Sequence, residues 1–158
     1  MKRIYGIVAL VVAALAAATV ATAAQSPAKT IVAVLNAGEE VPLCAAATNA
    51  SRGNFVAHVV DEATGAVEWK LVANNLPGNI VAAHIHLAVK GVAGGVVQPL
   101  PPTPGAENGV VGEGAFTNPA LLAAIRANPD GYYVNVHTNV CPRGVIRGQL
   151  GDHGPLNK

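Results

Sequence analysis

Short apolar or alternating runs, separated at close intervals by Gly, Pro and Asn, are the feature that most constrains the fold of this chain. Residues 30–35 form one such run, and residues 53–60 and 66–74 form two more on either side of the turn-forming segment 61–65. Runs of this length bounded by turn residues are typical of β-strands, and two of them around one short turn predict a hairpin. The pattern therefore predicts an all-β fold.

Five further runs of the same kind follow along the chain. They lie at residues 80–89, 96–100, 109–116, 131–138 and 144–150. The whole pattern predicts an antiparallel β-sandwich or barrel of about seven or eight strands. Because aromatic residues make up only 4% of the chain, Val, Ile, Leu and Ala must fill its core.

One short helix is predicted near residues 119–127. Asn118 is a typical N-cap residue, and Pro119 suits the first helical position. Asn128-Pro129 favours an end to the helix after one apolar stripe. The stripe consists of Leu121, Leu122 and Ile125.

Residues 1–23 have the features of a secretory signal peptide. Lys2 and Arg3 give a basic start, residues 4–18 are apolar, and Ala21-Thr22-Ala23 matches the small-residue cleavage pattern. The alternative is a retained membrane anchor. We expect the signal peptide to be removed and the mature protein to be exported to the periplasm or the extracellular space.

The rest of the chain is the size of one compact domain. We expect a linker at 24–29, one domain at 30–151 and a flexible tail at 152–158. Because Lys2 and Arg3 leave with the signal peptide, the formal net charge of +1 becomes −1. A nearly neutral chain without a basic cluster argues against nucleic acid as a partner, and no later segment predicts membrane insertion. An unknown protein or glycan partner, and the oligomeric state, remain open.

The two cysteines, Cys44 and Cys141, are predicted to form a disulfide. Exported proteins fold in oxidising compartments, where an even pair of cysteines is most simply a disulfide. The alternatives are two thiolate metal ligands or a redox-active pair. The wide separation of the two cysteines gives no CxxC motif that would favour those alternatives.

Three of the five histidines indicate a candidate metal site. His84 and His86 are two residues apart in a predicted strand, so their side chains point to the same face. His137, on a second predicted strand, can join them if the two strands lie close together. Three imidazoles suit zinc or copper, although a surface pair that only hydrogen-bonds its neighbours is the alternative. His58 and His153 are not assigned to the site.

The strand at 80–89 also predicts which face is buried. Its alternation assigns Val81, Ala83, Ile85, Leu87 and Val89 to the core. The histidine pair takes the opposite face, where loops can cover it.

Arg147 lies between two glycines in the last predicted strand. It is a candidate for holding a carboxylate, an anion or a cluster of carbonyls. The structural alternative is an ion pair with Glu68 or Glu113. Gly148 can allow another backbone to come near.

Motifs of the common catalytic machineries are absent from the sequence. It contains no GxSxG elbow, no HExxH helix and no phosphate-binding loop. The adjacent Glu39 and Glu40 point to opposite faces of an extended chain, so both are predicted to be solvated. No catalytic residue is assigned.

Several segments together resemble the chordin-type (CHRD) domain family, over residues 31–150. They are AHIH at 83–86, GGVV at 94–97, YVNVHT at 133–138 and PRGVIRGQL at 142–150, with GEEVP at 38–42. The family is named for its repeats in chordin, an extracellular growth-factor antagonist, and single-domain exported forms are widespread in bacteria. This chain has one domain and no chordin cysteine-rich module, so it looks like the bacterial form, and growth-factor antagonism is not carried over.

These features favour an exported CHRD-type binding module with a copper or zinc site at His84, His86 and His137. A structural, adhesion or protein-interaction domain without metal is the alternative. The H-x-H strand, the glycine loop and the later histidine are also similar to copper/zinc superoxide dismutase. This chain lacks that enzyme's further zinc histidines and aspartate, so a copper-dependent redox enzyme ranks last.

Overall fold

The computed structural model describes residues 29–151, and the predicted signal peptide and tail lie outside this range. It contains eight strands, one α-helix and two short 3-10 helices. In chain order they are β1 Thr30–Asn36, η1 Ala37–Glu39, β2 Arg52–Asp61, β3 Ala66–Asn74, β4 Ile80–Leu87, β5 Gly95–Pro99, β6 Gly109–Thr117, α1 Pro119–Ala127, η2 Pro129–Gly131, β7 Tyr132–Thr138 and β8 Ile146–Gln149.

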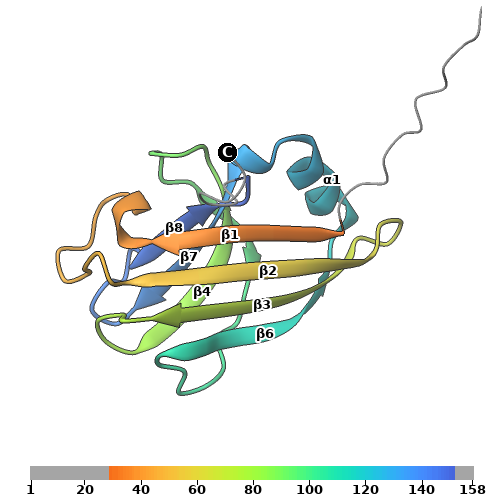
Figure 1. Ribbon diagram of the computed structural model, residues 1–158. Helices are drawn as coiled ribbons and strands as arrows, with labels where there is room; N and C mark the ends of the chain where they lie inside the picture. Colours follow the sequence, from red (N-terminus) through yellow and green to blue (C-terminus); the bar gives the residue numbers. More distant parts are fainter. Residues whose placement is uncertain (1–28, 152–158) are drawn as a thin grey trace, which may run out of the picture.

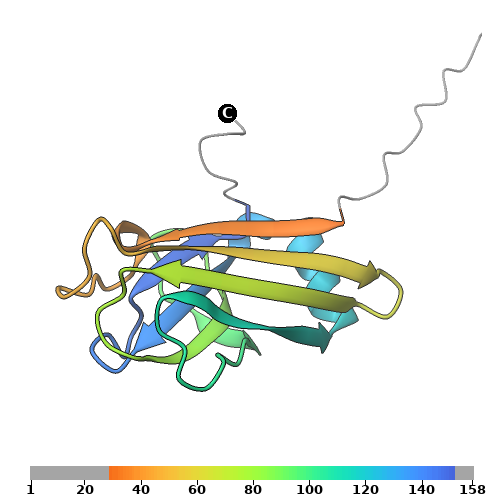
Figure 2. The ribbon, with the colours of Figure 1, turned by 60° about the horizontal axis from the view of Figure 1, so that its bottom comes forward.

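All eight strands belong to one sheet, in the order β5-β4-β7-β8-β1-β2-β3-β6. β1 pairs antiparallel with β2 over its whole length, whereas its register with β8 is limited to Asn36 and Arg147. Figures 1 and 2 show the sheet curled, so that β1, β2, β3 and β6 lie across β4, β7 and β8. The fold is an all-β half-barrel with one helix, which confirms the predicted fold class.

The hydrophobic core lies between the two halves of the curled sheet. On β2, buried and exposed residues alternate, as expected for a strand with one face in water. The buried positions include Phe55, Ala57 and Val59. The other half of the sheet contributes apolar residues to the same core, among them Ala83, Ile85, Val134, Val136 and Ile146.

The helix α1 connects β6 in one half of the sheet to β7 in the other half. The Asn118 side chain accepts a hydrogen bond from the backbone N–H of Leu121 at 3.0 Å, which confirms the predicted N-cap. The three residues of the predicted apolar stripe are buried in the core. Neither α1 nor any other helix of residues 29–151 has the length and hydropathy needed to cross a membrane.

Strand β4 buries less of its length than its apolar alternation predicts. Ala83 and Ile85 are buried, whereas Val81, Leu87 and Val89 are exposed to 54%, 53% and 55%. The strand ends at Leu87, and β-bulges against both neighbouring strands interrupt the regular register. The prediction of a continuous core face over residues 81–89 is therefore wrong at three of its five positions.

Two loops contact the outer face of the half formed by β4, β7 and β8. The β1–β2 loop, residues 37–51, is joined to the β7–β8 connection by the disulfide between Cys44 and Cys141, as predicted. The β4–β5 loop, residues 88–94, follows the histidine strand. An ion pair between Lys90 Nζ and Glu39 Oε1, at 2.8 Å, connects the two loops.

Candidate metal centre

The outer face of the β4–β7–β8 half is polar where its inner face is apolar. On β7 the valines lie in the core, whereas Tyr133, Asn135 and His137 alternate with them and face outward. The register between β4 and β7 places His84 opposite Asn135 and His86 opposite Tyr133. Two neighbouring strands therefore bring three histidines to one face.

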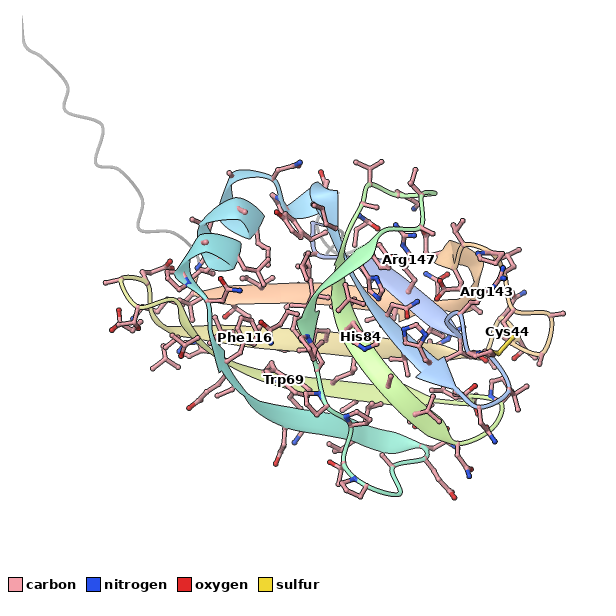
Figure 3. All side chains as sticks on the ribbon, turned by 180° about the vertical axis from the view of Figure 1, so that it is seen from behind. Cys44, Trp69, His84, Phe116, Arg143 and Arg147 are labelled. Carbon is pink, nitrogen blue, oxygen red and sulfur yellow. A yellow bond between two sulfur atoms is a disulfide. The ribbon has the colours of Figure 1, made fainter. Side chains whose placement is uncertain are left out.

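His84, His86 and His137 form a compact cluster on this face. One ring nitrogen from each residue can be chosen so that all three lie within 4.8 Å of one another. The centroid of the His84 ring is 5.0 Å from that of His137 and 5.5 Å from that of His86. Figure 3 shows His84 and Arg147 on the same half of the sheet, with the Cys44 disulfide near its edge.

Backbone carbonyls determine which nitrogen of two of these rings is free. The carbonyl of Gly94 lies 2.9 Å from His86 Nδ1, and that of Pro142 lies 3.1 Å from His137 Nδ1. Because a carbonyl only accepts hydrogen bonds, each Nδ1 donates its proton and each Nε2 keeps a lone pair. The Nε2 atom of His86 is buried and has no hydrogen-bond partner. Buried polar atoms of this kind are rare, which makes His86 Nε2 the best-placed ligand for an ion.

The third ring completes the set through its other nitrogen. His84 Nδ1 lies 3.1 Å from His137 Nε2 and donates a hydrogen bond to it when the latter is unprotonated. Binding of an ion would replace this bond, with the proton of His84 moved to Nε2. The ligands would then be His84 Nδ1, His86 Nε2 and His137 Nε2. In a tetrahedral site such nitrogens are about 3.4 Å apart, which small side-chain rotations can reach.

Burial keeps the three imidazoles neutral. It lowers the pKa of His84, and the neighbouring His86 lowers it further. Burial also lowers the pKa of His86, although the hydrogen bond to Gly94 opposes this effect. It lowers the pKa of His137 to about 4, against the opposing hydrogen bond to Pro142. Metal ions bind neutral imidazole, so the cluster is in its binding-competent form at pH 7.

The donor set limits which ions fit. Three imidazole nitrogens suit zinc with one additional ligand, or copper with an open position. Within residues 29–151, the cluster includes no carboxylate or thiolate. Calcium and magnesium prefer oxygen ligands, so they do not match this site.

Arg147 is buried and binds carbonyls, one of its predicted roles. Its Nη1 donates to the carbonyl of Val92 at 2.8 Å, and its Nη2 donates to that of Val89 at 2.9 Å. The guanidinium also donates to Gln149 Oε1 and lies 3.5 Å from the centre of the Tyr133 ring. Arg147 therefore attaches the β4–β5 loop to the sheet.

The alternative prediction, an ion pair of Arg147 with Glu68 or Glu113, is wrong. Both glutamates lie on β3 and β6 in the other half of the sheet, where Glu113 pairs with Lys70 at 3.1 Å. The sequence pattern could not exclude an ion pair between Arg147 and these glutamates, because it does not show which strands become neighbours.

The prediction that both Glu39 and Glu40 are solvated is wrong for Glu40, which is 3% exposed. Its carboxylate accepts hydrogen bonds from Asn135 Nδ2 and from the Val41 N–H. Burial raises the pKa of Glu40 to about 7, although the Val41 N–H and the positive charge of Arg147 partly oppose this. The 3-10 turn after β1 replaces the expected extended chain and directs Glu40 toward the sheet.

The two histidines that were not assigned to the site fall outside the cluster. His58 is exposed on β2, where it pairs in register with Glu68 on β3. Both strands belong to the half of the sheet that does not carry the cluster. His153 lies outside the described residues. Neither histidine is a candidate ligand on this geometry.

Comparison with known families supports the resemblance seen in the sequence. The model of the CHRD domain matches residues 31–150, which is nearly the whole described domain and includes all three clustered histidines. This chain belongs to the CHRD domain family. No curated protein and no solved structure matches it. The site of this CHRD domain must therefore be interpreted from its own geometry.

Sequence reasoning identified the three histidines but missed the groups that orient them. The carbonyls of Gly94 and Pro142 fix two ring tautomers, and backbone atoms leave no signal in residue identity. The glycine pair Gly94-Gly95 was the one available indication, because a β-carbon at residue 94 would lie 2.0 Å from the carbonyl oxygen of Leu87.

Proposed function

We propose that this CHRD domain is an exported binding module that holds one copper or zinc ion with His84, His86 and His137. The observation that supports this most strongly is the buried Nε2 of His86, which has no partner within a cluster of three imidazoles. Its Nδ1 donates a hydrogen bond to the carbonyl of Gly94. Metal-binding histidines usually donate the proton of their other ring nitrogen in this way.

Two features support export. The disulfide between Cys44 and Cys141 is typical of proteins that fold in an oxidising compartment. The basic and apolar start of the chain has the pattern of a secretory signal peptide. The domain would therefore meet its metal ion outside the cytoplasm.

Titration calorimetry of the mature, chelator-treated protein with Cu(II) and with Zn(II) tests the metal site. We expect one ion per chain for at least one of the two metals. The variant with alanine at His84, His86 and His137 should lose this binding, because it removes all three ligands. His58→Ala is the matched control, since it removes an exposed histidine from the other half of the sheet. Absence of binding to the wild type at micromolar metal would reject the proposal.

A second candidate function is a structural or protein-interaction domain without metal. It is favoured by the apolar side chains left exposed on the outer face of the other half of the sheet, namely Val34, Val56, Val60 and Val110. On this alternative His84→Ala lowers the melting temperature equally with and without metal. On the metal hypothesis, added metal raises the melting temperature of the wild type and not that of the variant.

A further inference from the structure

The β4–β5 loop is held to the sheet by two long side chains of β8. Arg147 donates to the carbonyls of Val89 and Val92, as described above. Gln149 Nε2 donates to the carbonyl of Ala88 at 3.1 Å, and Gln149 Oε1 accepts from Arg147. Three backbone carbonyls of the loop are therefore held by one buried pair of side chains.

Tyr133 connects this pair to the histidine cluster. Its ring stacks on His86 with centroids 4.7 Å apart and an interplanar angle of 8°. The guanidinium of Arg147 lies 3.5 Å from the same ring. Because β7 lies between β4 and β8, the imidazole and the guanidinium approach the tyrosine from opposite sides. His86, Tyr133 and Arg147 thus form one stack across three strands.

The end of the loop returns to His86. The N–H of Gly94 donates to the hydroxyl of Tyr133 at 3.1 Å, and the carbonyl of Gly94 accepts from His86 Nδ1 at 2.9 Å. Gly94 also packs closely on Leu87, since a β-carbon at residue 94 would lie 2.0 Å from the carbonyl oxygen of Leu87. The position of the Gly94 carbonyl, and with it the tautomer of His86, depends on how the loop is held.

We propose that Arg147 is a positioning residue of the metal centre. It binds the carbonyls of the β4–β5 loop and stacks on Tyr133, so that Gly94 fixes the proton of His86 on Nδ1 and leaves Nε2 free for the ion. This role rests on the proposed metal function, but its first step concerns the metal-free protein and can be tested there.

Arginine and lysine differ at such a position. The guanidinium is a planar fork that binds both carbonyls and stacks on the ring, whereas the ammonium of lysine is a point charge on a flexible stem. Arg147→Lys keeps the charge but loses this geometry, and Arg147→Met loses both. The two variants together separate a role of charge from a role of shape.

The test combines ring-nitrogen NMR of the metal-free protein with zinc titration. In the wild type we expect the His86 proton on Nδ1. In Arg147→Met we expect Nε2 to become protonated in a substantial fraction of molecules and zinc affinity to fall about 10–100-fold, the usual effect of losing an outer-shell partner. Arg147→Lys should show a smaller change of the same kind. Arg126→Met is the matched control, because Arg126 pairs with Glu62 away from the site.

If Arg147→Met does not fold, Arg147→Lys decides the matter. Gly94→Ala provides an independent disturbance of the same loop. We expect it to change the His86 tautomer in the same direction. An unchanged tautomer and a zinc affinity within twofold of wild type, in folded Arg147 variants, would overturn the proposal while leaving the metal function intact. If the wild type binds no zinc or copper, the metal function fails, and an altered tautomer in Arg147→Met would still support the positioning of His86.

Discussion

Glu40 is an acidic residue buried beside the candidate site without an ion-pair partner among its hydrogen bonds. Its carboxylate meets the amide of Asn135, whose Oδ1 atom is buried and has no hydrogen-bond partner. A protonated Glu40 can donate to that oxygen after rotation of the amide, which exchanges the bond from Asn135 Nδ2 for a bond to Oδ1. The neutral acid thus keeps a hydrogen bond to Asn135. This agrees with the raised pKa of Glu40, about 7, which results mainly from burial.

Glu40→Gln is therefore expected to remove one source of pH dependence from the stability of the protein. Between its ordinary pKa of 4.5 and its folded value of about 7, the folded state holds a proton that the unfolded state has released. Stability must then fall as pH rises through this window, by up to about 3 kcal/mol. Glutamine imitates the protonated acid, so the variant should gain stability over the wild type as pH rises.

Urea unfolding of both proteins at pH values from 4 to 8 measures this difference. The exposed Glu107→Gln serves as the control for loss of one carboxyl group. A wild-type-minus-variant difference that stays constant across the range would show that Glu40 has no raised pKa in the folded protein.

At the scale of elements, features encoded by neighbouring residues could be predicted from the sequence, whereas features that depend on the pairing of distant strands could not. The hairpin of β2 and β3 and the cap of α1 are encoded by neighbouring residues such as Asn118 and Pro119, and both are found. The bulges of β4 and the early end of this strand depend on its pairing with β5 and β7. Pairing between distant strands is not visible in local patterns.

The candidate site shows the same division. The H-x-H spacing places His84 and His86 on one face, which local strand geometry predicts. That His137 joins them depends on the pairing of β4 with β7, which the sequence allowed but did not establish. The burial of Glu40 depends on Gly144, where a β-carbon would lie 2.4 Å from Glu40 Oε2.

Gly148 tests the packing of one element against another. A β-carbon there would lie 2.3 Å from the carbonyl oxygen of Val34, at the junction of β8 and β1. Gly148→Ala should destabilise the protein by about 1–3 kcal/mol, because backbone atoms of a paired strand cannot move aside without strain. Urea unfolding measures the change. Gly95→Ala is the matched control, since no atom beyond its own chain neighbours lies within 4 Å of a β-carbon there, and its effect should be within about 0.5 kcal/mol. Equal effects of the two substitutions would contradict the close approach.

At the scale of the whole molecule, the β1–β2 and β4–β5 loops, which contact the outer face of the β4–β7–β8 half, are held in place by different interactions. The β4–β5 loop is held by side chains of β8, whereas the β1–β2 loop is held by a covalent bond between Cys44 and Cys141. The disulfide joins residues 97 apart in sequence, so it closes a loop of most of the domain. A cross-link over such a distance mainly restricts the unfolded chain.

Replacement of both cysteines by serine is expected to lower the free energy of unfolding by roughly 4–5 kcal/mol, the value for a closed loop of about 100 residues. This is a large part of the total stability of a domain of this size. Urea unfolding of the oxidised wild type and of the Cys44→Ser/Cys141→Ser variant measures the loss. A loss below about 1 kcal/mol would mean that the unfolded chain is already compact around this pair. The three ligands lie on β4 and β7 rather than on the cross-linked segments, so the folded variant should keep its metal binding. Loss of binding in a folded variant would show that a cross-linked segment contributes to the site, either the β1–β2 loop or the β7–β8 connection, where the Pro142 carbonyl accepts from His137.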